Sequence, residues 1–123
     1  MCVCLLVVFV GCSTPTRTSI QSKLRSEDYI ISSVSGLSLL GLYAGSQGVK
    51  HRITAIKYLN VSMDSDFNFS SEYYKVIVDW FWSESDAQTA YEKALANYGE
   101  DGAFIKGKMV AFGDAQAVAV VKS

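Results

Sequence analysis

The sequence predicts an α+β fold, in which one amphipathic helix packs on a mostly antiparallel sheet of about five strands. Three stretches predict this fold. Residues 73–82 alternate as a half-buried strand does, residues 85–98 repeat apolar side chains at helical spacing, and residues 103–121 hold two apolar runs around a Gly-Asp pair. We place the folded domain at residues 28–123 and expect two further segments before it.

The first half of the domain is expected to contain two strands joined by a loop. Residues 28–34 are rich in β-branched and aromatic side chains, which predicts the first strand. Residues 36–48 carry glycines among leucines and indicate an irregular apolar loop or a short helix. Residues 52–63 predict the second strand, which places on one face the side chains of Ile53, Ala55, Leu59, Val61 and Met63. A polar turn follows at residues 64–71.

The third strand and the helix have the clearest patterns. By the two-residue period of a strand, one face of residues 73–82 holds Tyr74, Val76, Val78, Trp80 and Trp82. Ser85 is the expected N-cap of the helix, with Gln88 completing a capping box, and Gly99 ends it. The apolar stripe of the helix comprises Ala87, Ala90, Tyr91, Ala94, Leu95 and Tyr98.

The last segment predicts a β-hairpin. Two apolar runs, residues 103–112 and 115–121, flank Gly113-Asp114. A two-residue connection that begins with glycine favours a type II′ turn.

The first twelve residues predict an export signal. Residues 2–10 are uncharged and apolar, and they are too few for a transmembrane helix, which needs about 20. Phe9-Val10-Gly11-Cys12 resembles the lipobox of bacterial lipoproteins, in which the chain is cut before the cysteine and the thiol is lipidated. We therefore expect a signal peptide at residues 1–11 and lipid attachment at Cys12. A buried N-terminal strand and a signal without lipidation are the alternatives.

The mature chain is expected to begin with a flexible tether at residues 12–27. Serine, threonine and glutamine dominate this segment, and apolar residues occur only singly, as Ile20 and Leu24. Such a composition buries too little surface to offset the entropy of ordering. Since Ser13, and not an aspartate, follows Cys12, we expect the outer membrane in a cell that has two membranes.

Charge and cysteine content exclude several classes of function. The 11 basic and 12 acidic residues give a formal charge of −1, which offers no basic surface for nucleic acid. The cysteines are Cys2, Cys4 and Cys12, so removal of residues 1–11 leaves one, and that one is acylated. Their spacing does not suit a metal site, and the single His51 lies far away in sequence. We expect no metal and no cofactor.

Two stretches support a resemblance to a protein family. After the lipid-attachment cysteine come Glu27-Asp-Tyr-Ile-Ile-Ser-Ser-Val-Ser-Gly36 and, later, Ala90-Tyr-Glu-Lys-Ala-Leu-Ala-Asn-Tyr-Gly-Glu-Asp-Gly102. This pattern resembles small uncharacterised bacterial lipoproteins such as the TRL-like group, in which an alanine-rich helix ends in a glycine and leads into a β-hairpin. The resemblance implies a location and a fold, and no activity.

No catalytic residues are predicted. Asp64-Ser-Asp-Phe-Asn68 opens as a calcium loop does, but Phe69 stands where the loop needs glycine and Lys75 where it needs glutamate, so a solvated turn is expected. Residues 41–50 lack the ending of a phosphate loop. No serine lies in the sequence context of a nucleophile, and we expect no enzyme.

One surface is a candidate for binding a partner. The loop before the second strand exposes apolar anchors beside a basic rim, and its candidate residues are Leu37, Leu42, Tyr43, Lys50 and Arg52. The alternative is that the leucines cover a sheet edge. The basic cluster at residues 50–52 has two interpretations, a contact with anionic lipid and a solvated loop. For Trp80-Phe81-Trp82, the alternatives are core tryptophans and an outer aromatic platform.

Together these observations predict a lipid-anchored protein of the bacterial envelope that acts as a non-catalytic binding or accessory module. Its expected partners are the membrane, through the N-terminal lipid, and an envelope protein or cell-wall component. A structural or stress-response lipoprotein is the main alternative, and a small secreted enzyme is the other.

Overall fold

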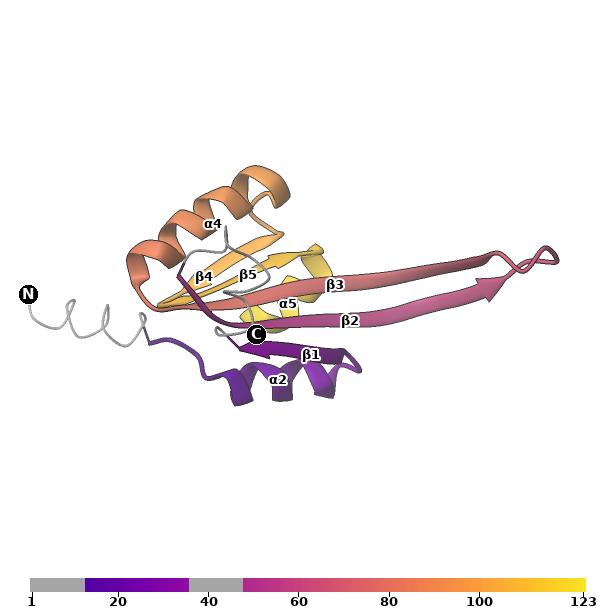
Figure 1. Ribbon diagram of the computed structural model, residues 1–123, viewed down its shortest axis with the longest axis horizontal. Helices are drawn as coiled ribbons and strands as arrows, with labels where there is room; N and C mark the ends of the chain where they lie inside the picture. The colour runs from indigo at the N-terminus through magenta and orange to yellow at the C-terminus, as the bar shows by residue number, and fades with distance from the viewer. Residues whose placement is uncertain (1–12, 36–47) are drawn as a thin grey trace, which may run out of the picture.

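The computed structural model describes residues 13–35 and 48–123 (Figure 1). Its elements are α2 (Arg17–Ser26), β1 (Ile30–Ser35), β2 (Val49–Met63), β3 (Phe69–Phe81), α4 (Glu84–Tyr98), β4 (Ala103–Lys106), β5 (Met109–Gly113) and α5 (Ala115–Lys122). The predicted signal peptide, the lipid-attachment residue Cys12 and the loop residues Leu37, Leu42 and Tyr43 lie outside the described residues.

The described strands form one five-stranded sheet in the order β1-β2-β3-β5-β4. Each neighbouring pair is antiparallel. The predicted α+β class, with helices on an antiparallel sheet of about five strands, is confirmed for this part of the chain.

Helices cover both faces of the sheet, whereas a single helix was predicted (Figure 1). On one face, α2 and α5 pack over a core cluster whose sheet residues include Ile53, Val76, Val78, Trp80 and Met109. On the other face, α4 packs over a second cluster that contains Val49, Phe81, Ala87 and Val110. Successive residues of β3 and β5 therefore alternate between two cores, which makes the centre of the sheet apolar on both faces.

Helix α4 confirms the predicted helix, with small differences at its ends. The N-cap is Ser83, whose hydroxyl accepts a hydrogen bond from the Asp86 backbone N–H, and not the predicted Ser85. The deepest contacts come from Ala87 and Ala94, whose small side chains let the helix approach the sheet closely. Tyr98, at the end of the predicted stripe, is half exposed.

The prediction of a flexible, unpacked tether at residues 13–27 is wrong. The Thr16 side chain caps helix α2, and both Ile20 and Leu24 are fully buried against the sheet. These two residues lie four apart, on one face of the helix, so a polar helix with a narrow apolar stripe still covers an open sheet face. The folded domain consequently begins well before residue 28.

The predicted hairpin at Gly113-Asp114 is also wrong. The turn between β4 and β5 lies at Gly107-Lys108, where Gly107 adopts a positive φ of 62°. The residues after Asp114 form helix α5, which buries Ala117, Val118 and Val121. A short run that is apolar at nearly every position can form either a helix or a strand that is buried on both faces. The sequence pattern alone therefore does not distinguish a helix from a strand here.

Strands β2 and β3 extend far beyond the rest of the sheet (Figure 1). Strand β1 pairs with β2 only as far as Ile56, and β5 pairs with β3 only from Val76 onward. Residues 57–74 therefore form a two-stranded ribbon with its connecting turn, here called the arm. The arm projects from the rest of the described residues, here called the body.

Candidate functional site

The two faces of the arm differ sharply in character. Cross-strand partners share a face, and side chains alternate along β3. Phe69, Ser71 and Tyr73 lie on one face, opposite Met63, Val61 and Tyr58 of β2. We call these six residues the apolar stripe; it lies on the same side of the sheet as helix α4, because Asp79 and Phe81 continue the alternation of β3 toward that helix.

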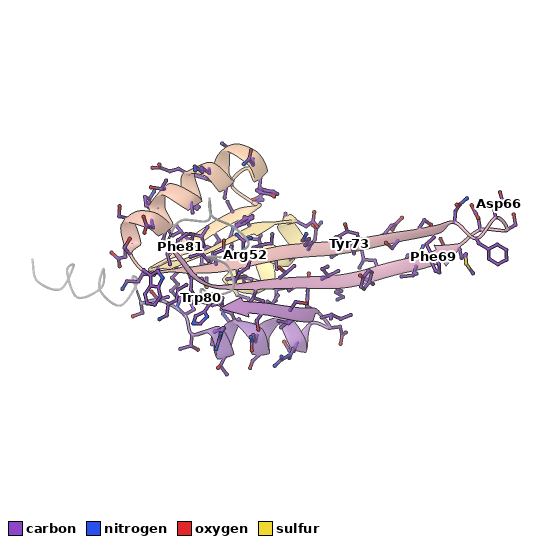
Figure 2. All side chains as sticks on the ribbon, in the orientation of Figure 1. Arg52, Asp66, Phe69, Tyr73, Trp80 and Phe81 are labelled. Atoms are coloured by element: carbon purple, nitrogen blue, oxygen red, sulfur yellow. The ribbon has the colours of Figure 1, made fainter. Side chains whose placement is uncertain are left out.

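The apolar stripe is exposed along its whole length. The exposed fractions are 51% for Tyr58, 57% for Val61, 51% for Met63, 75% for Phe69 and 47% for Tyr73. Tyr58 and Tyr73 contact each other edge to face, with ring centroids 6.0 Å apart. Figure 2 shows Phe69 and Tyr73 spaced along the arm. A row of large apolar side chains in water is the signature of a surface that another molecule covers.

The opposite face of the arm is polar. It carries the pairs Asn60–Glu72 and Ser62–Ser70. The hydroxyls of Ser62 and Ser70 are 2.6 Å apart and form a hydrogen bond across the strands. The arm is thus an amphipathic ribbon. Its large exposed apolar side chains belong to the apolar stripe, apart from Leu59 at the bulge and Phe67 at the tip.

A bulge at Leu59 produces this segregation. The register of β2 against β3 shifts between Tyr58 and Asn60, so Leu59 is the extra residue. One extra residue moves every later side chain of the strand to the other face. Ile53 and Ala55 therefore face helices α2 and α5, whereas Val61 and Met63 face the opposite way, and the prediction that all four share a face is wrong.

The tip of the arm is an acidic turn. The Asp64 carboxylate accepts hydrogen bonds from the backbone N–H groups of Asp66 and Asn68, each at 2.9 Å. The bond from Asn68 is the main reason that the pKa of Asp64 lies below its ordinary value. Phe67 adopts a positive φ of 65° and exposes 78% of its surface. The Asp64 carboxylate thus accepts hydrogen bonds from the backbone of its own turn, as expected for a solvated turn.

The end of the arm that adjoins the body is here called the root. On the face of the apolar stripe, the root presents a different set of side chains. Lys75 follows Tyr73 by two residues and pairs with Ile56, which in turn pairs with Ile30. Ile30 exposes 63% of its surface, and Lys75 is exposed. At the root, the Asp114 carboxylate accepts a hydrogen bond from the Lys75 backbone N–H at 2.8 Å. The stripe therefore has an apolar root, where Lys75 is exposed beside Asp114, and an acidic tip.

A buried ion pair lies beneath helix α4. Arg52 donates from Nε to Asp79 Oδ1 at 2.7 Å and from Nη2 to Oδ2 at 2.8 Å. The Asp79 side chain is only 4% exposed and that of Arg52 is 20% exposed. Burial raises the pKa of Asp79, and the hydrogen bonds and charge of Arg52 oppose this rise. A bidentate geometry of this kind offsets much of the cost of removing two charges from water.

A pocket of about 490 Å³ opens beside this ion pair, between α4 and the sheet. Its wall on the helix side includes Asp86, Lys93 and Asn97, and its wall on the sheet side includes Phe81 and Phe112. Arg52, predicted as part of a basic rim for a partner, lies in this wall and binds Asp79.

The predicted basic cluster does not form one patch. Lys50 lies over the exposed ring of Trp82, 5.0 Å from its centroid. The His51 Nδ1 is 3.2 Å from Arg17 Nη1 of α2, and burial lowers the pKa of His51. Arg52 points into the ion pair under α4. The three side chains thus serve three separate contacts.

The tryptophans also separate. Trp80 is 7% exposed and belongs to the core under α2, where its Nε1 donates to the Pro15 carbonyl at 2.8 Å. Trp82 is 65% exposed, because strand β3 ends at Phe81 and the chain turns into helix α4. Trp82 thus lies beyond the end of the strand and outside the core, and the core interpretation holds for Trp80 alone.

Among residues 13–35 and 48–123, no group of three or more histidine, cysteine or acidic side chains is placed to hold a metal ion. Within the same residues, every helix is too short or too polar to cross a membrane. Comparison with protein-family profiles, curated proteins and solved structures gives no match for this chain.

Sequence reasoning missed the arm as a candidate site. Its signal was the break in alternation at Ile56 and Lys57, which marks where β2 leaves the core and approaches its bulge. A second signal was the length of the two strands on either side of the polar turn. Strands of this length extend beyond the neighbouring strands and helices that a small domain can supply. Phe67 and Phe69 beside that turn were the third.

Proposed function

We propose that this protein is a lipid-anchored protein of the bacterial envelope, outer-membrane in a cell with two membranes, which acts as a non-catalytic binding module. Its binding surface is the apolar stripe of the arm. The observation that carries this proposal is the amphipathic character of the ribbon: one face is apolar and exposed, and the other is polar.

The energetics of a free ribbon support a binding role. A two-stranded hairpin is at best marginally stable in water unless further strands or a helix cover its apolar face. Strands β1 and β5 stop short of the arm, so within the described residues its edges remain open as well. A partner that buries the apolar face would therefore stabilise the ribbon.

The lipid anchor rests on the sequence around Cys12 and on its resemblance to a lipobox. The proposed relationship to TRL-like lipoproteins rests on this cysteine together with residues 27–36 and 90–102. The packing of the next residues supports a body held close to the bilayer. Thr14 accepts a hydrogen bond from the Lys108 backbone N–H at 2.9 Å, and the Pro15 carbonyl accepts the one from Trp80.

Metabolic labelling tests the anchor. Cells that express the full chain receive an alkyne fatty acid, and the wild type is compared with the variant Cys12→Ser. We expect label on the wild type and none on the variant, which should also retain residues 1–11. Equal labelling of the two proteins would overturn the lipid anchor, and fractionation with inner-membrane markers would overturn the proposed outer-membrane location.

Photo-crosslinking in intact cells tests the binding surface. A benzophenone amino acid replaces Phe69 in one version of the full chain and Ser70 in another. These neighbouring positions lie on opposite faces of the same strand. We expect a discrete protein adduct from position 69 and little from position 70. Equal adducts at both positions, or none at either, would contradict binding through the apolar stripe.

A further inference from the structure

We propose that the occupant of the apolar stripe is a second copy of this chain, with the two arms packed face to face and antiparallel. The two-fold axis passes near the pair Val61–Ser71, at the middle of the stripe. This inference rests on the proposed function and adds the identity of the partner.

The order of side-chain sizes along the stripe suits this symmetry. The large pair Tyr58–Tyr73 lies at the root end, the small pair Val61–Ser71 at the middle, and the large pair Met63–Phe69 at the tip end. Twisted ribbons that pack face to face approach most closely where they cross and diverge toward their ends. Small side chains at the crossing and large ones at both ends fill that space. The two-fold axis then places Met63 and Phe69 of one copy against the tyrosine pair of the other, where sulfur–aromatic and aromatic–aromatic contacts are favourable.

Charge supports the antiparallel direction. The stripe itself carries no ionisable group apart from the tyrosines, so two copies meet without like-charge repulsion. Lys75 stands four residues from Ser71 toward the root, and Asp64 and Asp66 stand three and five residues from Val61 toward the tip. At about 3.3 Å per residue, both sets lie roughly 10–17 Å from the axis. The acidic tip of each copy therefore reaches the level of Lys75 on the other copy.

The parallel alternative is unfavourable for the same reason. It sets acidic tip against acidic tip and Lys75 against Lys75. The carboxylates at the tip also oppose insertion of the arm into a bilayer, where ionised groups are costly. In the antiparallel arrangement, by contrast, the exposed Phe67 at the tip meets the apolar root that Ile30 and Ile56 form on the partner.

The available area is sufficient for a specific dimer. The five apolar side chains of the stripe are about half to three-quarters exposed, which corresponds to about 500–600 Å² per copy. Two copies bury about twice that area, which reaches the ~1,000 Å² that a specific interface requires. The contacts of Phe67 with the partner's root add to it.

The test uses two differently tagged versions of the full chain in the same cells, one of them carrying the benzophenone at position 69. We expect an adduct that contains both tags, with the crosslink mapped by mass spectrometry to the partner's Tyr58 or Tyr73. An adduct that contains a different protein would overturn the second copy and leave the proposed function standing. A two-tag adduct mapped to Phe69 or Met63 would overturn the antiparallel direction.

A matched pair of variants tests the contact. Val61→Glu puts a charge at the centre of the stripe, and Ser62→Glu puts the same charge on the polar face one residue away. We expect the first to lower the two-tag yield at least about tenfold and the second to change it less than about twofold. Since both variants place the same residue in neighbouring positions, an equal loss would indicate damage to the arm and would overturn the interface.

Charge reversal tests the ends of the interface. Lys75→Glu sets an acidic root against the partner's acidic tip, and we expect it to lower the two-tag yield about two- to fivefold. Adding Asp66→Lys to the same chain restores the attraction and should restore the yield. A double variant no better than the single one would contradict the antiparallel contact.

Discussion

At the scale of single residues, Arg52 and Asp79 define the most demanding contact of the body. Asp79 is 3% exposed, and both of its oxygens accept hydrogen bonds from Arg52. Such a pair contributes little net stability, but the loss of one partner leaves a buried charge without compensation. We therefore expect Arg52→Met to lower the free energy of unfolding by about 3–5 kcal/mol at neutral pH, measured by urea denaturation.

The control replaces both partners. In Arg52→Met with Asp79→Leu, the buried charge is gone and apolar side chains fill similar space. Stability should return to within about 1–2 kcal/mol of the wild type or exceed it. A double variant as unstable as the single one would show that lost packing, and not the unpaired carboxylate, causes the effect.

The same aspartate predicts a pH dependence. Burial, the largest effect, raises the pKa of Asp79 above its ordinary value, so the folded chain holds this proton more tightly than the unfolded chain. Its contribution to stability is then complete below the unfolded pKa of about 3.8 and is lost as the pH rises through the folded pKa. The difference in unfolding free energy between the wild type and Asp79→Asn should fall over that window and level off above it.

Urea denaturation across the acid to neutral range measures this difference, and Arg52→Met provides the comparison. Because Arg52 holds the pKa of Asp79 down, its removal should extend the fall to higher pH. A difference that rises with pH would mean that the attraction of Arg52 exceeds the cost of burial.

This pair shows which environments of single residues could be predicted from the sequence and which could not. Arg52 was expected at an exposed rim because it follows Lys50 and His51. Its true environment depends on the register that sets Arg52 opposite Asp79, and registers are decided by pairing between segments far apart in the chain. The burial of Trp80 was predictable because β-strand alternation alone places it with Val76 and Val78.

At the scale of elements, helix α2 shows that few apolar residues are sufficient where a sheet face is open. Ile20 and Leu24 are fully buried, and the rest of the helix is polar. We expect Leu24→Ala to cost about 2–5 kcal/mol of unfolding free energy, since a fully buried leucine leaves a cavity. Ser22→Ala, on the exposed side of the same helix, should change stability by less than about 0.5 kcal/mol.

Chemical denaturation of the full chain compares these two variants. Equal midpoints would indicate that α2 does not contribute to the core. The composition of residues 13–27 could not predict this helix, because its stability comes from tertiary contacts and its own sequence is polar. Helix α4 could be predicted, apart from the identity of its N-cap, since its apolar spacing and its terminal glycine lie within one local segment.

At the scale of the whole molecule, the body and the arm are separate structural units. Both core clusters draw their buried residues from outside the arm. We expect a variant in which Asn-Gly replaces residues 58–73, joining Lys57 to its cross-strand partner Tyr74, to unfold in one transition. Its midpoint should lie within about 5 °C of the wild type.

Thermal denaturation followed by circular dichroism makes this measurement. A shorter deletion, which replaces only the tip at residues 64–68 with Asn-Gly, serves as the control for the new turn. If the full deletion unfolds and the control does not, the arm is needed to form the hairpin that organises the sheet.

The overall architecture was predictable only in part. The class follows from local patterns, because strands such as β3 and helices such as α4 have distinct periods. The covering of both sheet faces was not predictable, because α5 consists mostly of alanines and valines, a composition that also suits a strand. The aromatic residues beside the turn were a local signal of the arm, but its length was not predictable, because the points where β1 and β5 end depend on pairing between distant segments.

The position of the first described residues has a consequence for the proposed dimer, if its N-termini are anchored in a membrane as proposed. Thr14 and Pro15 are fixed to the body, and they lie at the end of the molecule opposite the arm (Figure 1). In the proposed antiparallel dimer, the two copies of Pro15 would therefore lie farther apart than the roughly 50 Å that the 15 residues of β2 span. If both copies also carry the proposed lipid at Cys12, such a dimer would be a spacer of fixed length. Anchors in one leaflet would make the dimer lie flat, and anchors in two bilayers would make it a strut between them. Vesicles carrying the acylated chain distinguish these states, because a strut clusters the vesicles and a flat dimer leaves them dispersed.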